Sequence, residues 1–441
     1  MELLAGLILS LTAAVVGVWQ VTKRDRPLHG PLDDGSFGLP RLQRWDESYR
    51  PPRMQRLRSR LPRLEISRVL VMLTVVLALA GGVTYFVSRS NSQDLQQSAE
   101  AVTILQRVEA ERQRAATLAD PEAAYAALSA AEAMLAMAPE DGVDAGQLAM
   151  IQAQLAADIA RVTLSQRLSN VQIVGGAPPA PSGARSQLVS GGGNLYLLAD
   201  AVYQVDVFSS TLIRLLATGD VVDGAAVGAL LGATWREDRL IAIDSTRSYA
   251  FDASRGVWVA EQLAALGDVG YDGLAAIATF DRNLYIVTPE SGQILKFQAG
   301  AYDGTPEDWS AGVASPDLNR AIDMAIDGHV LVLLDDGRVL DFFRSRLEAA
   351  IVPRVIPPLE DAASIFVPTG GQYIYVLDAA DGRIVRLTRD GEVAQQLTSP
   401  LSAAMPILFG AIDMTVDESA GLAYILARDT IFTVRLPAPP Q

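Results

Sequence analysis

The chain has 441 residues, half of them hydrophobic, and its 51 Asp and Glu outnumber its 36 Lys and Arg to give a net charge of −15. This acidity argues against nucleic acid as a partner, because such a partner needs an excess of basic side chains. Cysteine is absent, which excludes disulfides and thiolate metal sites. The two histidines, His29 and His329, cannot form a three-histidine zinc site.

Two apolar runs near the N-terminus have the length of membrane-spanning helices. Residues 3–21 and 69–88 contain no charged side chain. At about 1.5 Å per residue each run covers roughly 30 Å, the hydrocarbon thickness of a bilayer. Basic residues follow the first run instead of preceding it, which favours a retained span over a cleaved signal peptide. We therefore expect transmembrane helices at 1–21 and 69–88.

The loop between these runs, residues 22–68, is strongly basic, with 12 Lys and Arg against six acids. Lys and Arg stay on the cytoplasmic side, so we expect a two-pass protein of a bacterial-type plasma membrane with its N-terminus and C-terminal part outside. The stretch 50–68 is either a topogenic linker or a surface for anionic lipid or an acidic partner. The basic side chains that would make those contacts include Arg53, Arg56, Arg58 and Arg60.

Residues 91–170 are rich in the helix formers Ala, Gln and Glu and predict a helical stalk. Asp120, Pro121 and Glu122 form a helix start, with a capping side chain, a proline at the first helical position and an acid in the first turn. Either a small bundle that raises the C-terminal part from the membrane or an oligomerising coiled coil fits this pattern. A Gly/Pro/Ser linker follows at 175–186.

The remainder contains one motif six times: a short strand, an apolar core strand, a Gly- or Asp-containing turn and a third strand. A looser fourth strand follows in most copies. The core strand recurs every 44 to 49 residues, and its equivalent positions are Leu195, Leu240, Leu284, Val330, Ile374 and Ala423. Four short antiparallel strands per period of this length are typical of a β-propeller blade. We expect a mainly β fold, a six-bladed propeller over residues 171–437.

The two ends of the repeat region predict how the ring closes. The sixth copy ends at "RLPAPPQ" with no room for a fourth strand, and an isolated strand pattern, 171–174, precedes the first copy. We expect 171–174 to be the outermost strand of the sixth blade, which would also protect an open edge.

The stretches "AIDMAIDGHVLVLLDDGRVLDF" (321–342), "GGQYIYVLDAADGRIVRL" (370–387) and "RNLYIVTPESGQILKF" (282–297) carry a family resemblance. Each resembles a blade of the NHL and YWTD-like six-bladed propellers, whose repeats carry a hydrophobic–Asp opening, a Gly turn, a tyrosine-bearing strand and a Gly-Arg-hydrophobic strand. The resemblance covers about residues 185–437, although the strict YWTD tetrapeptide is absent. It implies the fold and leaves the activity open.

Recurring aspartates are the main polar signal of the repeats. They either converge near the channel, where calcium would take their oxygens, or cap their own turns, which we favour because they recur in register with the turns. We expect no other cofactor, and a structural role for His329. The aspartates are Asp244, Asp323, Asp335, Asp378 and Asp413.

The function expected from these features is binding or scaffolding by a membrane-anchored extracytoplasmic propeller, either alone or within a larger membrane complex. The insert 301–319 supplies Tyr302 and Trp309, residue types favoured in interfaces with other proteins. One alternative is a metal-dependent hydrolase or lyase working in the channel, although no catalytic set is evident. The other alternative is a transmembrane sensor that signals through the basic loop.

Overall fold

The structure is a computed structural model that describes residues 74–78, 81–82, 99–138, 144–181, 185–266, 270–271, 273–310, 316–399 and 407–438. The expected span 1–21 and the basic loop 22–68, with Arg53, Arg56, Arg58 and Arg60, lie outside this part. Of the expected span 69–88, residues 74–78 and 81–82 are described and are helical. None of the helices in the described part combines the length and the apolar character needed to cross a bilayer.

Three helices occupy the expected stalk region: residues 99–117, α3 (Pro121–Ala136) and α4 (Ala145–Val162). The side chain of Asp120 caps α3 by accepting a hydrogen bond from the Glu122 N–H at 3.2 Å. Asp144 caps α4 in the same way. Each cap supplies an acceptor for an N–H group that has no partner within its helix.

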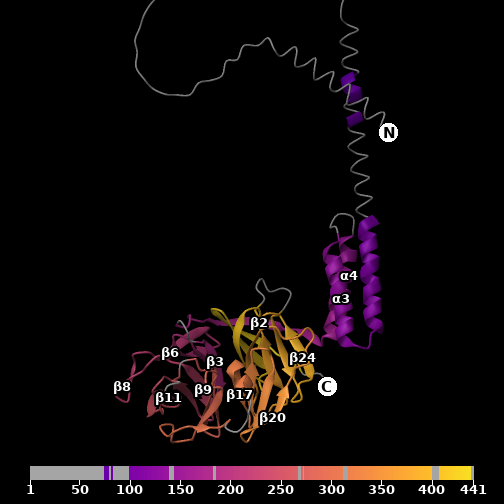
Figure 1. Cartoon of the computed structure of the whole chain (residues 1–441). Coiled ribbons are helices and arrows are strands. Elements are labelled where there is room, and N and C mark those ends of the chain that lie inside the picture. The colour runs from indigo at the N-terminus through magenta and orange to yellow at the C-terminus, as the bar shows by residue number, and fades with distance from the viewer. Residues whose placement is uncertain are drawn as a thin grey trace, which may run out of the picture. The chain divides into compact units, whose positions relative to one another are not determined.

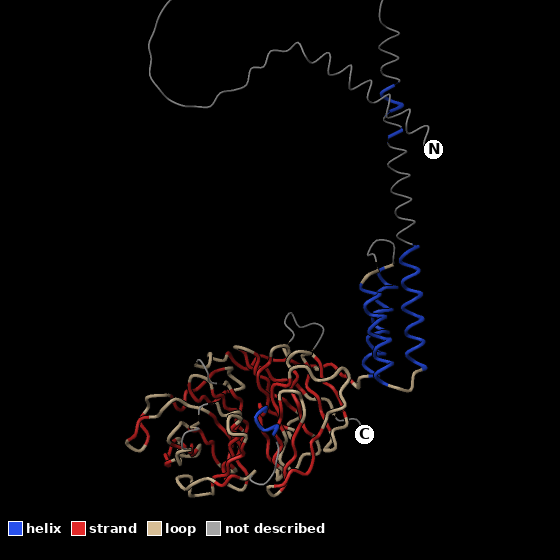
Figure 2. The backbone as a smooth tube through the Cα atoms, in the orientation of Figure 1, coloured by secondary structure: helices blue, strands red, loops and turns tan. Residues whose placement is uncertain are grey.

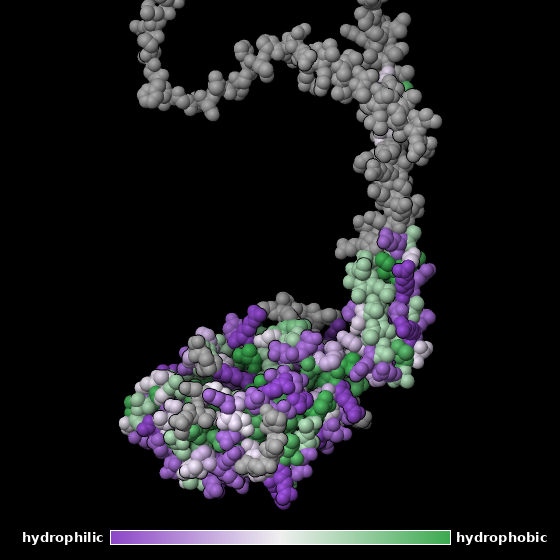
Figure 3. All heavy atoms as spheres, in the orientation of Figure 1, coloured by the Kyte–Doolittle hydropathy of each residue, from purple (hydrophilic) through white to green (hydrophobic). Residues whose placement is uncertain are grey.

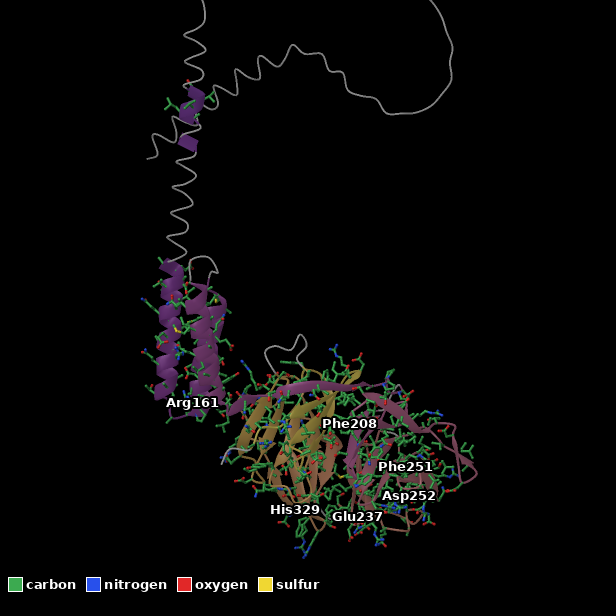
Figure 4. The ribbon with its side chains drawn as sticks, turned by 180° about the vertical axis from the view of Figure 1, so that it is seen from behind. Arg161, Phe208, Glu237, Phe251, Asp252 and His329 are labelled. Carbon is green, nitrogen blue, oxygen red and sulfur yellow. The ribbon has the colours of Figure 1, made fainter. Side chains whose placement is uncertain are left out.

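The Arg112 guanidinium joins the first of these helices to α4. Its Nε and one terminal nitrogen contact Asp158 at 3.0 and 2.9 Å, and the other terminal nitrogen donates to Gln154 at 2.7 Å. Asp158 also pairs with the exposed Arg161, one turn further along α4 (Figure 4). The helical part ends at Val162, before the predicted boundary at residue 170, because the chain turns into strands from Ser165.

Most strands in the described part of the chain form six sheets, here called blades one to six, each built on four antiparallel strands (Figures 1 and 2). In blades one to five the four antiparallel strands lie side by side in chain order with the first innermost, whereas the outermost strand of blade six comes from before the first blade. This confirms the mainly β, six-bladed propeller expected from the repeat. Blade one is β3 (Gln187–Gly191), β4 (Asn194–Leu198), β5 (Ala201–Asp206) and β6 (Thr211–Ala217); blade two is β9 (Gly232–Arg236), β10 (Arg239–Ile243), β11 (Arg247–Asp252) and β12 (Val257–Gln262); blade three is β13 (Ala276–Phe280), β14 (Asn283–Thr288), β15 (Gln293–Phe297) and β16 (Glu307–Asp308).

The second half of the ring follows the same plan. A short hairpin, β7 (Val221–Val222) and β8 (Ala225–Ala226), connects blades one and two, and a 3₁₀ turn at Pro316–Arg320 precedes blade four. Blade four is β17 (Ala321–Ile326), β18 (Val330–Leu334), β19 (Val339–Phe343) and β20 (Arg346–Ile351); blade five is β21 (Ala362–Phe366), β22 (Ile374–Asp378), β23 (Arg383–Leu387) and β24 (Val393–Thr398); blade six is β25 (Ala411–Asp417), β26 (Leu422–Ala427) and β27 (Thr430–Arg435), completed by β2 (Ser169–Gly176).

The ring closes between residues from opposite ends of the repeat region. Strand β2, which contains the expected closing strand 171–174, pairs antiparallel with β27 as the outermost strand of blade six. A second strand, β1 (Ser165–Arg167), pairs parallel with β24 and gives blade five a fifth strand. The sequence did not predict β1, because its three polar residues have no apolar alternation.

The innermost strands contact one another in cyclic order, β3, β9, β13, β17, β21, β25 and back to β3, and so surround a central channel. Apolar side chains fill the spaces between neighbouring blades. At the seam of blades one and two, for example, the rings of Tyr196 and Trp235 stack with centroids 6.0 Å apart. Each blade thereby buries both faces, which explains the continuous apolar core strands.

Candidate functional site

The innermost strands of blades four, five and six share an irregularity in their first three residues. Each has a β-bulge at the same place, and the extra residues are Ile322 in β17, Ala363 in β21 and Ile412 in β25. A bulged residue stands outside the ladder, so its carbonyl is free to accept from elsewhere. The first strand pairs of blades one, two and three have no such shift.

Arg185 binds the three freed carbonyls with one guanidinium. It donates to the Ile322 carbonyl at 2.6 Å, to the Ala363 carbonyl at 2.5 Å and, more weakly, to the Ile412 carbonyl at 3.4 Å. The residue stands just before β3, where the chain enters the ring. A single side chain therefore spans three consecutive blades at one mouth of the channel.

The residue after each bulged position is Asp323, Ser364 or Asp413. Both carboxylates accept from the next residue's N–H, and then from the neighbouring blade: Asp323 from the Ile365 N–H at 2.8 Å and Asp413 from the Leu188 N–H at 2.6 Å. The sequence favoured a role for these two aspartates as caps of their own turns, and this prediction is wrong for both. They join blade four to five and blade six to one.

Burial changes the protonation of this pair. Desolvation, together with the nearby Asp323 charge, raises the pKa of Asp413 to about 7 against the opposing pull of Arg185. Desolvation also raises the pKa of Asp323, against the pull of Arg185. One guanidinium thus faces two buried carboxyls, and the pair retains a proton at a pH at which an ordinary aspartate has lost it.

A cavity of about 430 Å³ opens at this mouth, and its walls differ in character. One wall carries Arg185, Asp323 and Asp413 from the bulged half of the ring. The other comes from blades two and three and the segments before them, and is mostly apolar: Leu230, Leu231, Leu274, Ala275, Ala276 and Ile277. Cavities of this size, with a few polar groups in an apolar lining, are typical of small-ligand or peptide sites.

The other recurring aspartates have local partners. Asp244 accepts from the backbone of Thr246 and Arg247, as a turn cap does. Asp378 forms a buried ion pair with Arg383, and Asp335 a surface pair with Arg320. In the described part of the chain no three His, Cys, Asp or Glu side chains come together as a metal site would require.

His329, labelled in Figure 4, has structural partners. Its Nδ1 lies 2.7 Å from the Asp341 carboxylate, and its ring stacks on Phe343 at 4.6 Å. His329 stands directly before β18, and both partners lie on β19 of the same blade.

The interaction candidates Tyr302 and Trp309 are buried, which corrects the expectation that they form a contact surface. The Tyr302 hydroxyl donates to the Arg282 carbonyl at 2.6 Å. Trp309 packs edge-on against Tyr285, with ring centroids 5.7 Å apart. Blade three has only a two-residue outermost strand, and this insert covers the apolar flank that a longer strand would cover.

Exposed aromatic side chains lie elsewhere. Phe208, in the turn between β5 and β6 and labelled in Figure 4, is fully exposed. It borders a groove of about 580 Å³ at the seam of blades six and one, with Asp206, Asp417 and Glu418 in its lining. The face drawn in Figure 3 mixes hydrophilic and hydrophobic residues without one dominant patch.

The sequence did not lead us to predict the role of Arg185 or the three β-bulges. The signal that was present is the repeated "AID" of blades four and six, whose Asp recurs as Ser364 in the "AAS" of blade five. Asp323, Ser364 and Asp413 occupy equivalent positions in consecutive blades, and recognising this equivalence would have indicated that one half of the channel is polar. Arg185 gives no such signal, because it stands in a linker outside the repeat.

Comparison with known proteins leaves the family open: no protein-family model matches the chain, and no curated protein matches its sequence. Solved structures resemble it in fold. A protein of unknown function from Bacteroides thetaiotaomicron is 14% identical over 60% of this chain and 75% of its own, with a TM-score of 0.45. The WD40 domain of Pan2 from Neurospora crassa is 12% identical over 63% of this chain and 99% of its own, with a TM-score of 0.38.

A third similar structure is PorZ, a surface component of the type-IX secretion system of Porphyromonas gingivalis. It is 12% identical over 62% of this chain and 40% of its own, with a TM-score of 0.36. At these values the likenesses carry no argument about function, and the propeller assignment stands on the strand topology above.

Proposed function

We propose that this chain is a membrane-anchored, extracytoplasmic propeller that binds a small ligand or the end of a peptide at the channel mouth and serves as a scaffold. The observation that carries the proposal is the cavity of about 430 Å³ with one polar and one apolar wall. Such a surface fixes a ligand's orientation through a few polar groups and obtains affinity from apolar burial.

The anchoring part of the proposal rests on the sequence. The runs 3–21 and 69–88 have the length and composition of bilayer spans, and the basic loop between them favours the cytoplasmic side. In this topology the acidic propeller lies outside the membrane, and the stretch 50–68 meets anionic lipid on the inner surface. The resemblance to NHL and YWTD-like propellers is compatible with a binding role and does not specify a ligand.

Binding is favoured over hydrolysis by what the channel carboxylates already do. Both oxygens of Asp323 and both oxygens of Asp413 accept backbone N–H groups. Neither carboxylate is free to act as a nucleophile without breaking a contact between blades. The hydrogen bonds of Asp323 and Asp413 between blades hold the polar wall of the cavity in place, as a binding site requires.

Two matched tryptophan substitutions test the proposal. Ala229 and Ala226 are both exposed and lie three residues apart before β9, but only Ala229 lines the cavity. The full chain, purified in a mild detergent, is analysed by native mass spectrometry for retained small molecules and chains. Wild type and Ala226→Trp should retain the same species, and Ala229→Trp should lose it. Equal retention by all three proteins, or none by wild type, would overturn the proposal.

A further inference from the structure

Two arginines on strand β23 are buried to the same degree but differ in their partners. Arg383 is 3% exposed and Arg386 is 2% exposed. Arg383 is neutralised by Asp378 and Asp381 at 2.8 and 2.9 Å. It also donates to Gln396 and to two backbone carbonyls, so its charge and its N–H groups are satisfied.

Arg386 has no such set of partners. One terminal nitrogen donates to Gln395 Oε1 at 2.8 Å, and the two terminal nitrogens approach the Pro437 carbonyl only at 3.3 and 3.4 Å. Its Nε has no hydrogen-bond partner. Within the described part of the chain no carboxylate lies within ion-pair distance of Arg386. The guanidinium is a buried cation without a contacting counter-charge.

The surroundings of Arg386 form a small cavity of about 320 Å³ at the seam of blades five and six. The guanidinium lies over the rings of Tyr375 and Tyr373, 5.2 and 5.6 Å from their centroids. The Tyr375 hydroxyl donates to Glu418 Oε1 at 2.7 Å. Tyr373, Tyr375, Arg386 and Glu418 all line the cavity, and Pro437 borders it.

A buried charge without a partner costs folding free energy, and a ligand that supplies the missing charge would offset this cost. We propose that this cavity binds the carboxylate group of a small ligand or peptide, which takes the place of the Pro437 carbonyl on the two terminal nitrogens of Arg386. Planar, bidentate recognition of a carboxylate is what a guanidinium does best. The Glu418 carboxylate in the same wall repels a dianion, which favours a carboxylate over a phosphate.

The binding test uses three probes that share a phenyl ring: N-acetylphenylalanine, its C-terminal amide, and phenyl phosphate. Titration of the full chain in mild detergent should show saturable binding of the carboxylate and binding at least about tenfold weaker for the other two, since a charge-assisted hydrogen bond contributes roughly a factor of ten or more. Arg386→Gln should weaken the carboxylate by a similar factor. Arg346→Gln, which removes an exposed arginine on β20, should leave it unchanged.

The unfolding temperature distinguishes an arginine that binds a ligand from one that only stabilises the fold. Arg386→Met should leave the unfolding temperature unchanged or raise it, because it removes an uncompensated charge, whereas Arg383→Met should lower it by several degrees. Lowering by both substitutions would make Arg386 structural and overturn the proposal. So would the absence of carboxylate binding to wild type, or equal binding of the amide or the phosphate. The channel-mouth proposal is unaffected, because no residue of that cavity is changed.

Discussion

The carboxylate of Asp413 on β25 accepts a hydrogen bond of 2.6 Å from the backbone N–H of Leu188 on β3. These residues lie 225 positions apart in the chain, and the bond joins the last blade to the first at the channel. At the outer edge the pairing of β2 with β27 closes the same blade. The ring is thus closed at both its inner and its outer circumference, and each closure can be tested separately.

The outer closure predicts opposite effects for two adjacent residues of β2. Val174 is 2% exposed and packs between blades six and one, whereas Ile173 is 64% exposed. Val174→Asp should cost about 3 kcal/mol or more of unfolding free energy, because it buries an unpaired charge. Ile173→Asp should cost less than about 1 kcal/mol. Urea unfolding followed by near-UV circular dichroism measures both, and equal losses would contradict this role of β2.

Asp413 predicts a pH dependence of stability with a defined sign. Its pKa is about 7 in the folded protein and about 4 when unfolded, so between these values the folded state binds more protons. Its contribution is therefore complete below about pH 4 and is lost as the pH rises through 7, with a slope of at most about 1.4 kcal/mol per pH unit.

Unfolding measured from pH 5 to 8 should show this decline in wild type and a flatter curve in Asp413→Asn. The control is Asp390→Asn: hydrogen bonding lowers the pKa of this exposed carboxyl, so it titrates below the window. An unchanged slope in Asp413→Asn would assign the decline to another group.

Arg185 predicts a stability loss that depends on pH. Arg185→Gln leaves three bulge carbonyls without their donor and two buried carboxyls without a nearby cation. We expect a loss of roughly 1–3 kcal/mol at pH 8, reduced for the partial exposure of this side chain, and a smaller loss at pH 5, where Asp413 is protonated. Arg214→Gln, which removes an exposed arginine paired at 3.8 Å, should change stability by less than about 0.5 kcal/mol.

The proposed topology can be tested directly because the chain contains no cysteine. Ala253→Cys places a thiol in the exposed turn between β11 and β12, and Ser59→Cys places one in the basic loop. In intact cells a membrane-impermeant maleimide should label position 253 and not position 59. After permeabilisation both should react. Labelling of position 59 in intact cells would reverse the orientation, and labelling of neither in intact cells would place the propeller inside.

The fold was largely predictable because most of each blade forms from one continuous stretch of the sequence. Alternating turns and apolar strands repeat at a fixed spacing, and the isolated strand pattern at 171–174 indicated the strand that pairs with β27. The site was less predictable because it arises from the ring as a whole. Asp323 and Ser364 become neighbours only when their strands are adjacent, and Arg185 joins them from outside the repeat. The prediction that Tyr302 and Trp309 form a contact surface failed because residue type alone does not distinguish an exposed aromatic side chain from one that covers a blade edge.

Ligand contact at the channel mouth can be measured by photocrosslinking from within the cavity. A benzophenone amino acid at position 229, which lines the cavity, is compared with the same residue at position 226, which does not. We predict a covalent adduct of one defined mass from position 229 and none from position 226 when the full chain is irradiated in cells. An adduct from position 226 alone, or from neither position, would contradict binding at the channel mouth.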